Sequence, residues 1–147
     1  MTIKVRRGQL EDEKALYKLA RQYQTGREAI TAAEFQIALD NVLRYRPQET
    51  NVLFVAELDG TVVGYSLLTV SRLLHAPGLT AHLQEIVVDE QHRRNGIGDR
   101  LMQANEHYCI GRGVRQMSAV TSHMGNFYNH RDFEAIGQHY RKVLEIG

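Results

Sequence analysis

The sequence predicts one α/β domain (α+β mixed), with a mixed, mostly antiparallel central sheet of six to seven strands and helices on both faces. Three observations support this prediction. Segments rich in β-branched and aromatic residues alternate with helical apolar stripes, three strands follow one another in the middle of the chain, and a strand, glycine turn, helix and strand come next. The 147 residues fit a single domain spanning residues 1–147.

The N-terminal part predicts one strand followed by two helices. Ile3 to Arg6 alternates as a short strand, and Glu11 to Tyr23 carries an apolar stripe at helical spacing. The second helix has a clear start signal, because Thr31 and Glu34 form a capping box. We expect it to end near Arg46, before a proline.

The middle of the chain predicts an antiparallel meander. Val52 to Glu57 and Thr61 to Val70 are two strands, and Asp59-Gly60 between them suits a tight hairpin turn. Ser71 to Gly78 is a predicted loop. Leu79 to Val88 is then a third long strand.

The C-terminal part predicts a crossover unit and a final hairpin. A helix beginning near Ile97 ends at Gly111 or Gly113, and Val114 to Thr121 returns as a strand. Because a strand, a helix and a strand in sequence form a right-handed crossover, this strand should lie parallel to the preceding one. A short helix is expected at residues 126–131, and one or two strands at residues 133–144.

The composition excludes several classes of protein. A formal net charge of +1 argues against a general nucleic-acid or membrane-surface binder, which would carry a basic stripe. A single cysteine, Cys109, excludes an internal disulfide, and the chain has no apolar leader after Met1, so we expect a reducing cytoplasm. The seven histidines are scattered without the spacing of a zinc site, so no metal is predicted.

The junction from Leu83 to Met102 is the strongest candidate for a binding site. A helix N-terminus has unpaired amides and a partial positive charge, and the glycines of Gly96-Ile97-Gly98 let an anion approach. A dinucleotide fingerprint would need a third glycine, where Leu101 stands, and an acidic residue about 20 residues later, which is missing. A cradle for a pyrophosphate fits better. The remaining alternative is that the two glycines only shape a loop.

This junction resembles the pyrophosphate loop of the GCN5-related N-acetyltransferase (GNAT) superfamily. Arg93, Gly96 and Gly98 match its Q/R-x-x-G-x-G/A motif, within the segment QEIVVDEQHRRNGIGDRLM. Phe127-Tyr128 and Phe133 resemble the late F-Y-x-x-x-G-F signature, although Asp132 stands where the family has glycine. The predicted order of elements is also similar, which implies a GNAT-like fold.

The resemblance implies acetyl-CoA as the donor and direct transfer to an amine in a ternary complex. The pantetheine arm would pair with the strand end at Val87 and Val88. Asn126 would touch the pantetheine or the sulfur. The pyrophosphate would bind the backbone amides of Arg93, Arg94, Asn95, Gly96, Ile97, Gly98 and Asp99.

Glu85 and Tyr128 are the candidate catalytic residues. Glu85 would act as the base, through water or after burial raises its pKa, and strand alternation predicts Leu83 and Val87 beside it on one face. The alternative is a structural ion pair between Glu85 and an arginine. His82, predicted on the opposite face, is a second candidate base. By resemblance, Tyr128 would protonate or hydrogen-bond the leaving thiolate.

The acceptor amine is left open, with a small metabolite amine and a peptide amine both compatible. By resemblance, Tyr23, Gln24 and Arg27 would line the acceptor site. The alternative function is a non-catalytic acyl-CoA-binding regulatory or oligomerisation module. Because few residues remain after Phe133 for a complete hairpin, an uncovered sheet edge and a homodimer are also expected.

Overall fold

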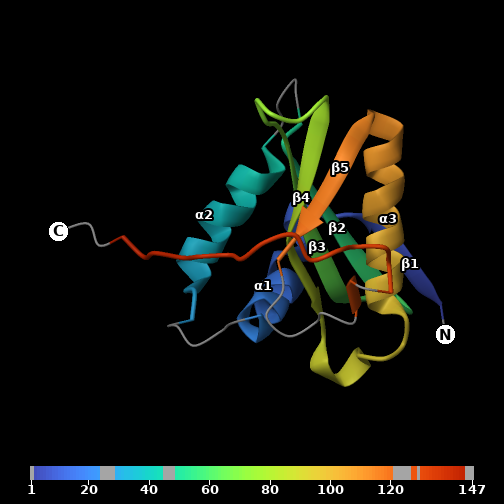
Figure 1. Cartoon of the computed structure of the whole chain (residues 1–147). Helices are drawn as coiled ribbons and strands as arrows, with labels where there is room; N and C mark the ends of the chain where they lie inside the picture. Colours follow the sequence, from blue (N-terminus) through green and yellow to red (C-terminus); the bar gives the residue numbers. More distant parts are fainter. Residues whose placement is uncertain (1, 24–28, 45–48, 121–126, 129, 145–147) are drawn as a thin grey trace.

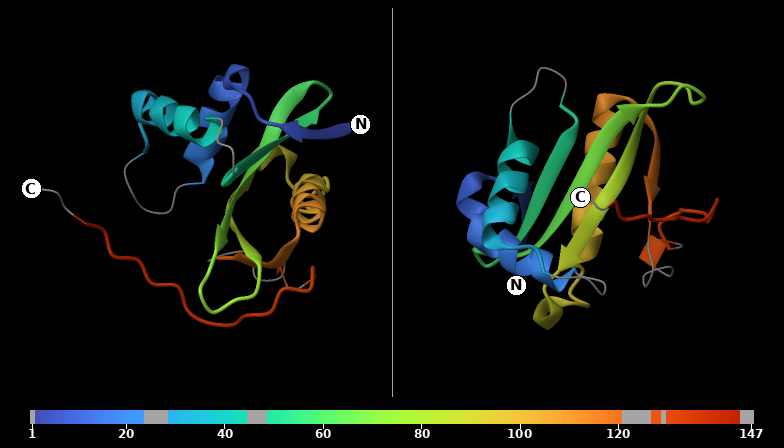
Figure 2. Two further views of the ribbon diagram at one scale, coloured as in Figure 1. Left: turned by 90° about the horizontal axis from the view of Figure 1, so that it is seen from above. Right: turned by 90° about the vertical axis from the view of Figure 1, so that its left-hand side faces the viewer.

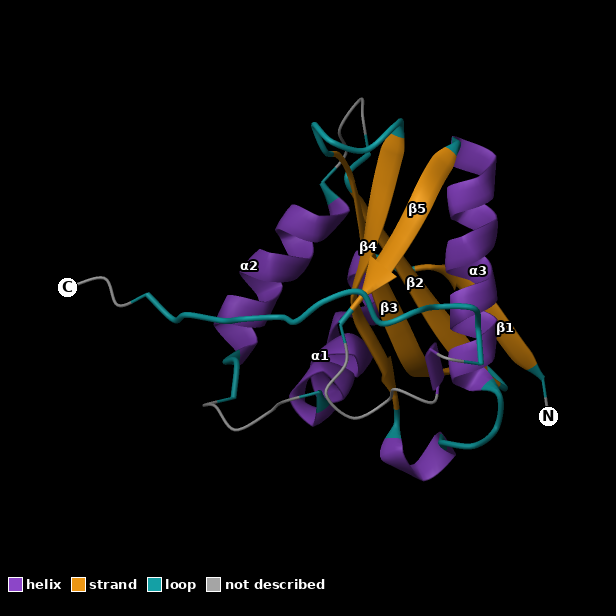
Figure 3. Ribbon diagram, in the orientation of Figure 1, coloured by secondary structure: helices purple, strands orange, loops and turns teal. Residues whose placement is uncertain are grey.

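The computed structural model describes residues 2–23, 29–44, 49–120, 127–128 and 130–144. In this part of the chain five strands form one mixed sheet in the order β1-β2-β3-β4-β5 (Figures 1 and 3). The first four are antiparallel to their neighbours and β5 is parallel to β4, as the crossover rule predicts. The strands are β1 (Ile3–Arg7), β2 (Asn51–Leu58), β3 (Thr61–Arg72), β4 (Leu79–Val88) and β5 (Val114–Ala119).

Helices cover both faces of the sheet, as predicted. Helices α1 (Glu13–Gln22) and α2 (Ala32–Leu43) lie on one face, and α3 (Ile97–Arg112) lies on the other (Figure 2). Two single 3₁₀ turns, η1 (Leu10–Asp12) and η2 (Glu90–His92), precede α1 and follow β4. In the described part of the chain, no helix is long and apolar enough to cross a membrane.

The cap signals in the sequence act as predicted. The Thr31 hydroxyl accepts a hydrogen bond from the backbone amide of Glu34, and the Glu34 carboxylate accepts one from the backbone amide of Thr31. Helix α2 ends at Leu43, three residues before the predicted Arg46. Helix α3 ends at Arg112 and is capped by Gly113, whose φ of +82° lies in the left-handed region that favours glycine.

Each face of the sheet has its own apolar core. On the α3 side the core includes Leu68, Leu83, Ile86 and Leu101. On the side of α1 and α2 it is built from Leu16, Leu19, Leu39, Leu53, Val55, Tyr65 and Val87. Because side chains alternate between the faces of a strand, this division shows which way each strand residue points.

A β-bulge in β4 reverses one of our predictions. In the pairing with β3, Leu67 lies opposite Glu85 and Leu68 opposite Leu83, so Gln84 is an extra residue. Leu83 therefore packs on the α3 side, whereas Val87 packs with α1 and α2. The prediction that Leu83 and Val87 flank Glu85 on one face is wrong for Leu83.

The two parallel strands β4 and β5 separate part of the way along. Their pairing runs from Leu79 with Val114 to Leu83 with Ala119, where β5 ends. The last four residues of β4, from Glu85 to Val88, are paired with β3 but not with β5. Within the part of the chain that the structure describes, no strand pairs with this edge of β4 beyond Leu83.

The predicted strands at residues 133–144 are absent. The whole segment has no regular secondary structure, and Figure 1 shows it crossing in front of the sheet. Its apolar side chains remain largely outside the core, with Ile136, Tyr140 and Leu144 each more than three-quarters exposed. The described sheet therefore has five strands instead of six or seven, and β5 is an edge strand.

Candidate functional site

The start of α3 forms a backbone cradle for an anion. Gly96 is the N-cap residue, with a φ of +79°, and no side chain caps the helix there. The amide of Arg100 bonds the Gly96 carbonyl at 3.1 Å, so the amides of Ile97, Gly98 and Asp99 precede the first bond of the helix. A Cβ atom at Gly96 would meet no atom within 4 Å, so the space beside this N-cap residue is open. This arrangement fits a phosphate group.

Side chains around the cradle are already engaged in local contacts. The Arg93 Nε atom donates a hydrogen bond to the Val88 carbonyl at 3.2 Å. The side-chain amide of Asn95 donates one to the His92 carbonyl, also at 3.2 Å. Asp99 pairs with Arg131, and the Ile97 side chain is fully buried. The backbone is therefore the part of this loop that is free to bind an anion. The exposed Arg94, with a φ of +68°, adds positive charge.

Gly98 allows the C-terminal aromatic residues to approach the cradle. A Cβ atom at Gly98 would lie 3.1 Å from the Phe127 ring, which is closer than packing normally permits. The Phe127 ring also stacks under the guanidinium of Arg131, whose carbon lies 3.7 Å from the ring centroid. This close packing places Tyr128, the neighbour of Phe127, beside the same end of the sheet.

The open edge of β4 presents alternate backbone groups. The Asp89 amide donates to the Val63 carbonyl at 2.8 Å, so Val63 and Asp89 form a hydrogen-bonded pair of the β3–β4 ladder. Because such pairs alternate, Val87 also bonds β3, while the backbone groups of Ile86 and Val88 point to the open edge. The Arg93 contact with the Val88 carbonyl agrees with this direction.

Glu85 lies in a cluster of tyrosines on the face of α1 and α2. The Tyr65 hydroxyl donates to Glu85 Oε1 at 2.6 Å, and the Tyr23 hydroxyl donates weakly to the Gln84 carbonyl at 3.5 Å. Burial raises the pKa of Tyr65, and the Glu85 charge raises it further, so this phenol stays protonated. In the described structure Glu85 has no ion pair with arginine, which was the structural alternative.

Tyr128 is buried close to this cluster. Its ring packs edge-on against Phe127 and Phe133, with centroids 5.3 Å away in both cases. Burial, followed by the nearby Tyr23, raises the pKa of the Tyr128 hydroxyl above its usual value. Asp132, which stands at the glycine position of the family signature, adopts a left-handed φ of +64°, a conformation that glycine adopts readily. Asn126, Gln24 and Arg27 lie outside the described residues.

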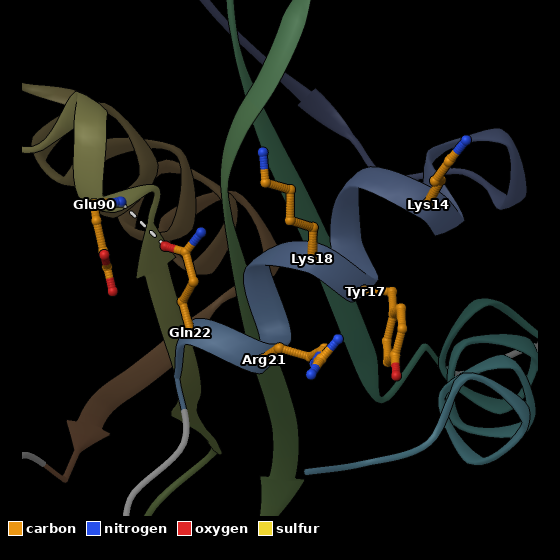
Figure 4. Close-up of a pocket in the computed structure, with 6 residues that line it drawn as sticks. All are labelled: Lys14, Tyr17, Lys18, Arg21, Gln22 and Glu90. Carbon is orange, nitrogen blue, oxygen red and sulfur yellow. Dashed lines mark hydrogen bonds between the residues drawn. The ribbon is translucent and has the colours of Figure 1, made fainter.

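A separate pocket of about 640 Å³ lies along the outer side of α1 (Figure 4). The Gln22 side chain connects this helix to the loop after β4. Its Nε2 atom donates a hydrogen bond to the Asp89 carboxylate at 3.0 Å, and its Oε1 atom accepts one from the Glu90 backbone amide at 3.1 Å. None of the predicted site residues lines the pocket. Its lining consists of Lys14, Tyr17, Lys18, Arg21, Gln22 and Glu90.

The predicted residues come from both faces of the sheet, and two further residues were not revealed by the sequence. Tyr128 belongs to the core on the α3 side, next to Phe127, which contacts Gly98, whereas Glu85 lies on the face of α1 and α2. Tyr65 and Ile86 were not predicted. The bulge at Gln84 also corrects the placement of His82. Ala81 and Leu83 pack on the α3 side, so His82 points to the face that carries Glu85 and not to the opposite one.

Comparison with known proteins agrees with this arrangement. A family model described as the acetyltransferase (GNAT) family matches residues 14–137. An N-alpha-acetyltransferase from Sulfurisphaera tokodaii is 47% identical over 58 residues, a match that covers 35% of this chain and 35% of the relative. This match therefore spans about a third of the length of the relative.

Two solved structures share the whole fold. A glucosamine-6-phosphate N-acetyltransferase from Arabidopsis thaliana superposes with a TM-score of 0.81 at 20% identity, over 99% of this chain and 100% of that one. A transcriptional regulator from Bacillus halodurans has a TM-score of 0.82 at 17% identity, over 97% and 100% of the two chains. At these identities the likeness shows the fold alone. With the family match over most of its length, the chain belongs to the acetyltransferase (GNAT) family.

Proposed function

We propose that this protein transfers an acetyl group from acetyl-CoA to a primary amine, by direct attack in a ternary complex. The observation that carries the proposal is the separation of β4 from β5 after Leu83. It leaves an open strand edge between the Gly96 cradle on one side and the Glu85 cluster on the other. A donor could thus be held at both its charged end and its amide-rich arm.

The donor would be held mainly by backbone groups. The amides at the start of α3 would bind the pyrophosphate, with Arg93 and Arg94 adding positive charge nearby. The amides of the pantetheine arm would pair with the β4 edge from Ile86 to Val88, as in strand addition. In this segment Val87 contributes its buried side chain, because its backbone groups face β3.

Glu85 would act as the general base of the transfer, and Tyr128 would stabilise the leaving group. The amine nitrogen attacks the thioester carbon, the carbon–sulfur bond breaks, and the sulfur leaves as a thiolate. Glu85 would take the proton of the attacking amine, directly or through one water, while Tyr65 holds its other oxygen. The Tyr128 hydroxyl, kept protonated by its raised pKa, would donate a hydrogen bond to the thiolate.

The acceptor that we favour is the α-amino group of a peptide. The partial relative is named an N-alpha-acetyltransferase. An α-amino group has a pKa of about 7.7–8.0, compared with about 10.4 for a lysine side chain, so it is easier for a carboxylate to deprotonate near neutral pH. A small metabolite amine is the second acceptor class to be tested.

Replacing Tyr128 with phenylalanine tests the proposed reaction. Thiol release from acetyl-CoA would be measured with a panel of peptide and small-molecule amines. We expect the wild type to release CoA in an amine-dependent way, and Tyr128→Phe to lower kcat about 10-fold or more, because the thiolate loses its hydrogen bond. If acetyl-CoA binds but no amine elicits CoA release, the protein is a non-catalytic acyl-CoA-binding module instead.

Among the described strands β5 pairs only with β4, and its other edge supports a second proposal, that the protein forms a homodimer. A strand edge with unpaired backbone groups favours pairing with another copy. Small-angle scattering at micromolar concentration should then give twice the mass of 16.8 kDa. A mass that stays at one chain across the concentration range would contradict this prediction.

A further inference from the structure

The sheet face that carries Glu85 is apolar over some strands and polar over others. Over β2 and β3 it is apolar and packs against α1 and α2. In the described part of the chain, no helix covers the middle of β4 or the strand β5 on this side (Figures 1 and 2). The side chains there are polar and at least partly exposed. We call this group the polar ledge, formed by Thr69, His82, Gln84 and Ser118.

Hydrogen bonds hold the polar ledge in one arrangement. His82 and Ser118 are direct neighbours in the parallel pair of β4 and β5, and the His82 Nδ1 atom lies 2.7 Å from the Ser118 hydroxyl. The Gln84 side chain donates to the Thr69 hydroxyl at 3.0 Å. Within the described residues, the His82 Nε2 atom makes no hydrogen bond, so it is available to a ligand.

The polar ledge is uncharged near neutral pH. Burial is the main cause that lowers the pKa of His82, and the nearby His139 of the C-terminal segment lowers it further. The neighbours on β3 and β5 are the neutral hydroxyls of Thr69 and Ser118. Such a surface suits uncharged amide groups better than a phosphate or a carboxylate.

The spacing from Glu85 matches an extended peptide. His82 and Glu85 lie on the same face, and because Gln84 is an extra residue their partners on β3, Thr69 and Leu67, are two residues apart, which is about 7 Å along a strand at roughly 3.3 Å per residue. A peptide whose first nitrogen is at Glu85 and which runs back along β4 would therefore bring its third residue to His82. A small amine bound at Glu85 would not reach that far.

We propose that the polar ledge binds the main chain of an extended peptide acceptor, with His82, oriented by Ser118, as its anchoring residue. This inference rests on the proposed acetyl transfer and specifies its substrate class. One hydrogen bond from His82 to a peptide amide contributes about 1 kcal/mol, close to a 5-fold to 10-fold change in affinity. Its effect should be confined to acceptors long enough to reach the ledge.

The experiment compares acceptors of increasing length. The value of kcat/KM is measured for a single-residue amide and for a tetrapeptide amide with the same first residue. In the wild type we expect the tetrapeptide to be at least 5-fold better, through a lower KM. The ratio should fall close to 1 in His82→Ala, recover in part in His82→Asn, and fall less in Ser118→Ala. His75→Ala, which changes an exposed histidine in the β3–β4 loop, should keep the wild-type ratio.

A binding measurement separates this inference from the proposed reaction. Binding of a fluorescent tetrapeptide amide to the CoA-loaded protein needs no turnover, and we expect His82→Ala to weaken it 5-fold or more. If the wild type shows no turnover but binds the tetrapeptide more tightly than His82→Ala does, the proposed reaction is refuted and the proposal for the polar ledge is supported. The ledge proposal is overturned if His82→Ala leaves the length ratio unchanged, or if the wild type does not distinguish the two acceptors. Thermal unfolding of each variant checks that the fold is kept.

Discussion

Replacing Glu85 with glutamine is expected to lower kcat about 100-fold or more, with a much smaller change in the KM for acetyl-CoA. Glutamine has nearly the same shape, and its amide oxygen can still accept the Tyr65 hydroxyl that lies 2.6 Å from Glu85 Oε1. What it loses is the ability to take a proton from the attacking amine, which contributes 10²–10⁴-fold in general base catalysis. Steady-state thiol release with the best peptide amine would measure both constants.

Two further variants distinguish a catalytic Glu85 from a structural one. Tyr65→Phe keeps the carboxylate but removes its hydrogen bond, so we expect a smaller fall in kcat, about 10-fold, together with a changed pH profile. Asp40→Asn changes an exposed carboxylate on α2 and should match the wild type. If Glu85→Gln keeps its activity across the pH range, another group takes the proton, and the role that we propose for Glu85 is wrong.

Replacing Gly96 with alanine is expected to raise the KM for acetyl-CoA about 10-fold or more. The φ of +79° at Gly96 is costly for any residue with a Cβ atom, roughly 1–2 kcal/mol. The new methyl group would also project into the open space beside the N-cap residue, where it would hinder the approach of a phosphate to the amides of α3. Binding of acetyl-CoA by calorimetry would report the loss directly.

Gly113 at the other end of α3 provides a matched control for this substitution. It has a φ of +82°, and a Cβ atom there would also meet nothing within 4 Å. Gly96→Ala and Gly113→Ala should therefore destabilise the fold to a similar extent, since both force alanine into the left-handed region. Only the first should weaken acetyl-CoA binding. Equal binding by the two variants would show that the cradle does not hold the donor.

Much of the sheet and its helices could be predicted from local sequence patterns. The capping box at Thr31 and Glu34, the Asp59-Gly60 turn and the left-handed Gly113 each specify a short-range geometry, and all three are found. The C-terminal segment is different. Its apolar residues do not alternate as in a half-buried strand, and a strand there would need a partner edge that the sequence does not identify. The prediction of terminal strands failed because strand formation depends on that pairing.

The residues of the candidate site could be predicted only where they lie close together in the sequence. The Gly96 cradle lies within one stretch of the chain, and Glu85 precedes it by eleven residues. Tyr65 was missed because it belongs to a different strand and meets Glu85 only through the pairing of β3 and β4. The bulge at Gln84 was missed because an extra residue in a strand leaves no signal in composition, yet it decides which face receives Glu85.

The bulge in β4 makes the pairing of its other residues more important than the bulged residue itself. Gln84 is exposed and lies opposite no residue of β3, so the fold would tolerate many side chains there. Its removal would leave a regular ladder in which Leu83 and Glu85 keep their partners and their faces, whereas a residue gained or lost elsewhere in β4 would turn the side chains on one side of the change to the other face. Among functional relatives, insertions and deletions should therefore be far rarer at the paired positions of β4 than at position 84.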